Sequence, residues 1–148
     1  MDYLEILLRL GIAALAGGVI GLDRDLHGKP VGVRTLGIVS IGSAMIVIAG
    51  AHLSPTPDGN EVSRVIQGLI TGIGFLGAGV IVHQKDSAVT LGLTTAACIW
   101  LTSVIGIVCG LADWRLLVIS QALIFLILVL GGPIEKAVHK WWDNKPEN

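Results

Sequence analysis

The chain has 148 residues, of which 53% are hydrophobic and 14% charged, and its formal net charge is −1. A soluble domain normally carries about 25% charged residues, so this composition excludes an ordinary soluble protein and indicates an integral membrane protein. The sequence also has no basic tract interleaved with aromatic residues, so we expect no nucleic-acid partner.

Five apolar runs predict five membrane-spanning helices joined by short polar loops. Each run approaches the roughly 20 residues that a helix needs to cross a bilayer core. The predicted spans cover residues 4–22, 35–53, 66–82, 92–111 and 114–131. We therefore expect an all-α, polytopic membrane protein, with a five-helix transmembrane bundle over residues 1–133. Gly132-Pro133 should end or kink the last span, and residues 134–148 should form an amphipathic cytoplasmic tail.

The first span contains one basic residue, Arg9, near one of its ends. Glu5 lies four residues earlier, so the two side chains can pair on one helix face, and the arginine can extend to the membrane border. A polar role inside the bundle stays open as the alternative, because charges within spans are costly and often functional.

The polar stretch after the first span is predicted to be a loop over residues 23–34. Its acids Asp23 and Asp25, together with His27, could hold a hard cation such as Mg²⁺, which takes one or two carboxylates. We favour the alternative, an ion-pair cluster with Arg24 and Arg34. Because antiparallel neighbouring spans bring their ends together, we expect Asp23 and Arg34 to form an ion pair.

The third span is rich in glycine, with Gly68, Gly72, Gly74, Gly77 and Gly79. Glycine weakens a helix by roughly 1 kcal/mol relative to alanine, so a packing reason is needed. In lipid, small residues let two helix backbones approach closely. Residues 72–77 match the G-x-G-x-x-G pattern, but they lie inside one apolar run and not between a strand and a helix. We therefore interpret this span as a close-packing element and not as a nucleotide loop.

Small residues four positions apart also occur in the first and fourth spans. These pairs are Gly17 with Gly21 and Gly106 with Gly110. With the third span, they provide more small-residue surface than one five-helix bundle needs. We therefore expect a homo-oligomer, most simply a two-fold dimer.

The basic residues predict the orientation in the membrane. Seven lie on one side and two on the other, and the richer side should be cytoplasmic. The seven are Arg24, Lys29, Arg34, Lys85, Lys136, Lys140 and Lys145, and the two are Arg64 and Arg115. The N-terminus should then be outside and the C-terminus inside.

This orientation groups the candidate functional residues at the cytoplasmic end of the bundle. They are Asp23, Arg24, Asp25, Arg34, Gly77, Gly79, Thr94 and Thr95. We expect this half to be the most closely packed, with the threonines bonded within their helix or to the glycine-rich helix.

Four sequence blocks resemble the MgtC/SapB family of bacterial inner-membrane proteins. They are GVIGLDRD at 18–25, GKPVGVRT at 28–35, GIGFLGAGVI at 72–81 and GLTTAA at 92–97. The resemblance implies a bacterial inner-membrane location. It also implies a link to survival in low magnesium, to virulence inside phagocytes or to restraint of the F-type ATP synthase. Virulence members carry a C-terminal ACT-like domain, and we expect this chain to be a short form without it. Asp23 and Asp25 stand where the family commonly has glutamate.

Two classes of function stay open. No catalytic triad, metalloprotease motif or P-loop occurs in the sequence, so we expect neither an enzyme nor a cofactor. The first class is a non-catalytic regulator of other membrane proteins that supports adaptation to low magnesium or stress. Its partners would be the lipid bilayer, a second copy and inner-membrane proteins such as the F-type ATP synthase. The alternative is an oligomeric transporter or channel for a cation or small solute. We favour the regulator because the spans carry few charges at mid-depth.

Overall fold

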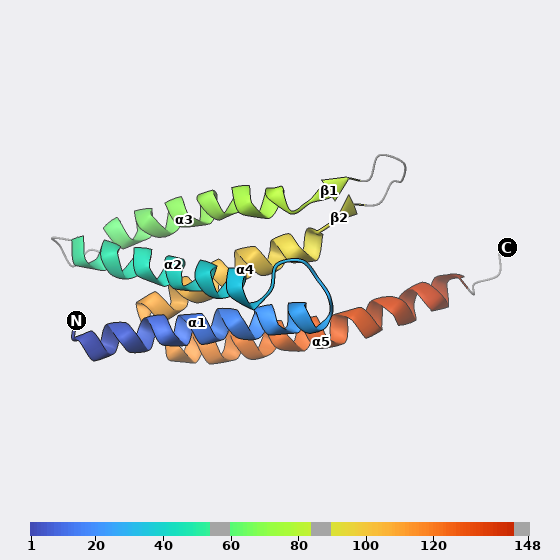
Figure 1. Cartoon of the computed structure of the whole chain (residues 1–148), viewed down its shortest axis with the longest axis horizontal. Coiled ribbons are helices and arrows are strands. Elements are labelled where there is room, and N and C mark those ends of the chain that lie inside the picture. Colours follow the sequence, from blue (N-terminus) through green and yellow to red (C-terminus); the bar gives the residue numbers. More distant parts are fainter. Residues whose placement is uncertain (54–59, 84–89, 144–148) are drawn as a thin grey trace.

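The computed structural model describes residues 1–53, 60–83 and 90–143, and these residues form five helices and one short β-ribbon (Figure 1). The elements are α1 Tyr3–Leu26, α2 Val33–Leu53, α3 Asn60–Gly79, β1 Val82–His83, β2 Thr90–Leu91, α4 Leu93–Leu111 and α5 Trp114–Asp143. All five helices are long and apolar enough to cross a membrane. The predicted all-α membrane fold is therefore confirmed.

The core lies between α1, α2 and α4, with α3 and α5 at the periphery (Figure 1). In the most apolar window of each helix, 61% of the residues of α4 are buried, compared with 11% for α3 and 6% for α5. Fully buried side chains include Ile20 of α1, Leu36 of α2 and Ile105 of α4. The central helix is therefore α4, and not the glycine-rich α3.

Glycines of α1 and α4 allow both helices to contact the backbone of α2. A Cβ atom at Gly17 would lie 2.7 Å from the carbonyl oxygen of Leu36, and one at Gly110 would lie 2.9 Å from Val47 Cβ. A Cβ at Gly106 would overlap the carbonyl oxygen of Ser40. Because no side chain fits at these positions, the glycines of α1 and α4 form close-packing seams inside the chain, and these two seams are not the surplus surface that we expected a second copy to use.

The prediction that the glycines of the third span pack closely against another helix of the same chain is wrong for α3. A Cβ added at Gly68, Gly72, Gly74 or Gly79 would meet nothing within 4 Å. At Gly77 it would make an ordinary contact, 3.7 Å from Ala96 Cβ. The reason is the peripheral position of α3, of which only Ile73 and Gly77 are buried.

The closest packing is also not confined to the predicted cytoplasmic half. Gly17 and Gly21 lie toward the end of α1 that continues into the first loop, whereas Gly106 and Gly110 lie toward the opposite end of the bundle. Gly79, which we expected in the tightest region, is open. Close contacts follow α2 along its length because both α1 and α4 pack against it, α1 through Gly17 and Gly21 and α4 through Gly106 and Gly110.

Two predicted helix boundaries are wrong at the first loop. Helix α1 continues to Leu26 and α2 begins at Val33, so the loop shortens to residues 27–32. The turn is tight because a Cβ at Gly21 would lie 2.5 Å from the Val33 backbone. The backbone N–H of Lys29 donates to the Arg24 carbonyl at 2.9 Å, which closes the end of α1.

The other two differences concern α5 and the loop after α3. Helix α5 is continuous through Pro133 to Asp143, because a membrane helix tolerates the lost proline N–H, and its last part projects beyond the bundle (Figure 1). Residues 144–148 of the predicted tail lie outside the described residues. The expected plain loop at 83–91 instead begins and ends in an antiparallel ribbon that pairs Val82 with Leu91 and His83 with Thr90.

The glycine contacts generate a stability prediction. Gly106→Ala should lower the melting temperature in detergent, because the new methyl group overlaps the α2 backbone and overpacking costs about 1–3 kcal/mol. Gly74→Ala is the matched control, since it adds the same methyl group to a helical glycine with open space around it. The packing argument fails if the two variants melt at the same temperature.

Candidate functional site

Arg24 is a buried arginine between the end of α1 and the start of α4. It lies in the last turn of α1 and is only 5% exposed. Its Nη2 atom donates to Thr95 Oγ1 at 2.5 Å. Thr95 is the third residue of α4 and is itself buried. We call this end of the bundle, where α1 ends and where α2 and α4 begin, the Arg24 end.

The two acids beside Arg24 face other groups. Asp23 Oδ1 lies 3.3 Å from His27 Nδ1. Asp25 Oδ2 accepts the Val33 backbone N–H at 3.0 Å and so caps the start of α2. Adjacent helical residues do not face each other, and among the described residues neither acid forms an ion pair with Arg24.

The predicted pair between Asp23 and Arg34 is wrong. Because α1 continues past its predicted end, Asp23 lies within the helix and faces His27. Arg34 lies in the first turn of α2 and is exposed. No ion pair joins them in the part of the chain that the structure describes.

The remaining predicted residues separate into two groups. Thr95 contacts Arg24, and the buried Gly77 lies against Ala96, the next residue of α4. Thr94 and Gly79 are exposed and lie outside this contact. The structure therefore brings Arg24 and Thr95 together. Gly77 of α3 lies next to this contact, against Ala96, the residue of α4 that follows Thr95.

Asp23 and Asp25 do not converge on a shared cation position. One faces His27, and the other caps α2. Within residues 1–53, 60–83 and 90–143, no three potential His, Cys, Asp or Glu ligands come together. The geometry therefore gives no support to the hypothesis that Asp23, Asp25 and His27 together bind a cation.

The sequence analysis missed Gly92, which positions the first turn of α4. Gly92 is the N-cap residue with φ of +91°, and a Cβ atom there would overlap the Val80 carbonyl oxygen. Its own carbonyl accepts the Ala96 N–H at 2.8 Å. A glycine at the first residue of the predicted span was the available signal, but the close approach to Val80 is visible only in the fold.

A second arginine lies at the opposite end of α4. Arg9 pairs with Glu5 on α1, which confirms the predicted i, i+4 pair. Its Nη1 atom also donates to the Gly110 carbonyl at 2.5 Å, in the last turn of α4. Arg9 therefore points into the bundle rather than out to the membrane border, and a cation is favourable at this helix C-terminus.

Between the two arginines, α2 and α4 contribute neutral hydroxyls to the interior, and the Gln121 amide of α5 donates to the Ala16 carbonyl at 3.2 Å. Ser43 Oγ lies 2.9 Å from Ser103 Oγ and donates to the Val39 carbonyl at 2.8 Å. Ser40 and Thr102 are also fully buried. These small side chains fit where α2 and α4 approach most closely, so they are part of the packing seam.

The Arg24 contact generates a prediction with an internal control. Thr95→Val keeps the side-chain volume but removes the acceptor for the buried guanidinium, so it should cost about 1–3 kcal/mol of stability. Thr94→Val changes the neighbouring, exposed threonine and should stay within about 0.5 kcal/mol of the parent. Thermal unfolding in detergent compares them, and equal melting temperatures would contradict a stabilising Arg24–Thr95 bond.

Comparison with known proteins gives several relatives of similar sequence. SrpB of Synechococcus elongatus is 39% identical over 140 residues, which cover 88% of this chain and 76% of SrpB. The Escherichia coli K12 protein named "Putative magnesium transporter YhiD" is 38% identical over 129 residues, covering 84% of this chain and 59% of YhiD. MgtC of Salmonella typhimurium LT2 is 34% identical over 128 residues, covering 86% of this chain and 51% of MgtC.

These alignments cover most of the chain but only part of the longer relatives. The chain spans about half the length of MgtC and about 60% of YhiD. No solved structure matches it significantly. The family profile described as MgtC family matches residues 10–137, which include all of α2 and α4 and most of α1. The chain therefore belongs to the MgtC family.

Proposed function

We propose that this chain is a non-catalytic inner-membrane protein that supports adaptation to low magnesium or stress by binding other membrane proteins. The observation that carries the proposal is the open glycine face of α3. Gly68, Gly72 and Gly79 share this face at helical spacing, and none of them has a neighbour within 4 Å of its Cβ position. Since glycine weakens a helix and the chain itself does not use this space, the favoured explanation is a helix from outside the chain.

A shallow apolar groove beside this face supports the same explanation. It lies between α2 and α3 and is lined by Ile46, Val65, Gly68, Leu69, Gly72, Ile73 and Leu76. Phe75 of α3 is 84% exposed. Exposed apolar side chains are also compatible with contact to lipid alone. The groove supports a protein partner only because the open glycines Gly68 and Gly72 are part of its lining. The first occupants to examine are a second copy, as a homodimer, and the F-type ATP synthase.

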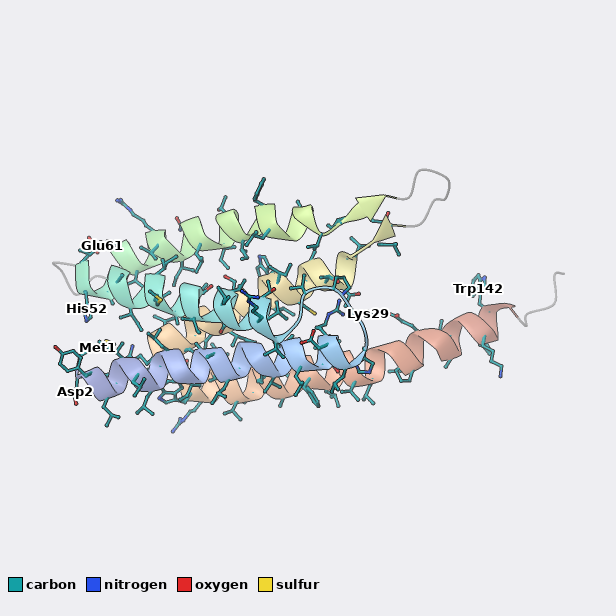
Figure 2. The ribbon with its side chains drawn as sticks, in the orientation of Figure 1. Met1, Asp2, Lys29, His52, Glu61 and Trp142 are labelled. Carbon is teal, nitrogen blue, oxygen red and sulfur yellow. The ribbon has the colours of Figure 1, made fainter. Side chains whose placement is uncertain are left out.

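The proposed orientation has the N-terminus outside and the C-terminus in the cytoplasm. Five helices connected in sequence put the two ends of the chain on opposite sides. Figure 2 shows Met1, His52 and Glu61 at one end, Lys29 toward the other, and Trp142 beyond the bundle. The Arg24 end also carries the exposed Lys29 and Arg34, so the positive-inside rule favours it as the cytoplasmic end.

The name of the YhiD relative favours transport as a second candidate function. Within one protomer, α1, α2 and α4 contact through their backbones, and the interior carries hydroxyl groups between Arg9 and Arg24. This packing supports the regulator over a single-chain pore, so a transport path would have to form between copies. Magnesium uptake into proteoliposomes that hold the purified chain would favour transport and contradict the regulator.

The partner proposal predicts a loss of function without a loss of fold. Gly72→Leu fills the open face of α3, so it should leave thermal stability near that of the parent but abolish complementation of growth at low magnesium. The assay strain lacks its own MgtC-family member. Gly42→Leu is the matched control, because it adds the same side chain to an open helical glycine of α2. Co-purification from native membranes should lose the same partner in the Gly72 variant alone. Full complementation by that variant would refute α3 as the contact surface.

The orientation predicts the outcome of reporter fusions. Fusions after positions 85 and 148 should be active with a cytoplasmic reporter, and one after position 57 with an external reporter. The three positions follow α2, α3 and α5, so together they report the direction of α3 and whether α4 and α5 return the chain to the same side. An external signal at position 85 or 148 would overturn the topology.

A further inference from the structure

Arg24 is a buried cation that lacks a counter-charge in the described part of the chain. It is 5% exposed, its Nε atom is buried without a partner, and its one hydrogen bond goes to the neutral Thr95 hydroxyl. A guanidinium group carries five N–H donors, so most of its donor capacity is unused. Burial of an arginine without a counter-charge is costly, which points to an acceptor from outside the chain.

The start of α4 adds a second source of positive potential at the same place. Helix α4 has 19 residues and no side-chain cap at its N-terminus. Its first backbone hydrogen bond among the described residues runs from Ala96 N–H to the Gly92 carbonyl, so the preceding turn presents N–H groups. A helix N-terminus attracts anions and repels cations, yet Arg24 bonds to Thr95 in this turn.

The contrast with Arg9 shows how unusual this placement is. The Nε atom of Arg9 is also buried without a partner in the described chain, but Arg9 lies at the C-terminal end of α4, where the dipole favours a cation, and it has both the Glu5 carboxylate and the Gly110 carbonyl as acceptors. Arg24 lies at the end that disfavours a cation, and the neighbouring carboxylates of Asp23 and Asp25 face His27 and Val33. A bound anion would satisfy both Arg24 and the first turn of α4.

We propose that Arg24 and the first turn of α4 bind a phosphate-type oxyanion. The planar guanidinium fork matches phosphate oxygens, and backbone N–H groups at the helix N-terminus can contact the other oxygens. The exposed Lys29 and Arg34 at this end raise the local concentration of anions. The phosphate comes either from the headgroup of an anionic lipid or from free phosphate in the aqueous phase. The inference goes beyond the proposed function and does not depend on a protein partner.

Thermal unfolding of the purified full chain separates the two sources. One arm compares inorganic phosphate with chloride at equal ionic strength in a neutral detergent. The other arm compares nanodiscs of phosphatidylcholine with nanodiscs that also contain phosphatidylglycerol. When the concentration of phosphate or of phosphatidylglycerol is about ten times its dissociation constant, we expect the melting temperature to rise by about 3–6 °C in at least one arm. A rise with inorganic phosphate identifies the free anion, and a rise with phosphatidylglycerol alone identifies the lipid. No rise in either arm overturns the proposal.

Variants connect the shift to Arg24. Arg24→Gln should abolish the rise, whereas Arg34→Gln, which removes an exposed arginine at the same end, should keep it. If Arg24→Gln does not fold, the Thr95→Val variant tests the proposal instead. This variant keeps Arg24 but removes the Thr95 hydroxyl that orients its guanidinium group. The Thr95 variant should need about tenfold more ligand for the same rise. An unchanged ligand requirement, or an equal rise in Arg24→Gln and the parent, overturns the proposal.

Discussion

The contact of α2 with the backbones of α1 and α4 is the constraint on which the rest of the structure depends. In a bilayer the hydrophobic effect does not drive helices together, so their association relies on close packing and hydrogen bonds. Gly17 lets α1 reach α2, and Gly106 and Gly110 let α4 reach its other side. Small polar residues fit the same seams, as the Ser43–Ser103 contact shows. These three helices form the core against which the peripheral helices pack.

This core also decides where the two interior arginines lie. Because α1 runs beside α4 over nearly its whole length, Arg9 reaches the last turn of α4 and Arg24 reaches the first. The two positions differ in their electrostatics: Arg9 has a carboxylate and a favourable helix end, and Arg24 has neither. Of the two interior arginines, Arg24 is therefore the one that has no carboxylate partner among the described residues.

The peripheral helices have a different role from the core. Helices α3 and α5 contribute few buried residues, although α3 carries more glycines than its own contacts use. The relatives YhiD and MgtC are longer than the chain, which aligns with 59% and 51% of them. The part of these relatives that aligns with this chain corresponds to the helical bundle.

The sequence by itself determined the membrane class, the number of helices, the Glu5–Arg9 pair and the seams in α1 and α4. These features depend on local composition and on residues four positions apart, which share a helix face wherever that helix lies. Only the tertiary structure decided which helix is central. Glycine spacing is the same whether a face meets a neighbour, as at Gly106, or open space, as at Gly72. The tertiary structure also decided that Arg24 is buried and that Asp23 is separated from Arg34. Both features depend on how far α1 extends and on which residues of α4 lie beside the last turn of α1. The Arg24–Thr95 bond joins residues 71 positions apart and the Arg9–Gly110 bond residues 101 positions apart, separations at which sequence periodicity carries no information about proximity.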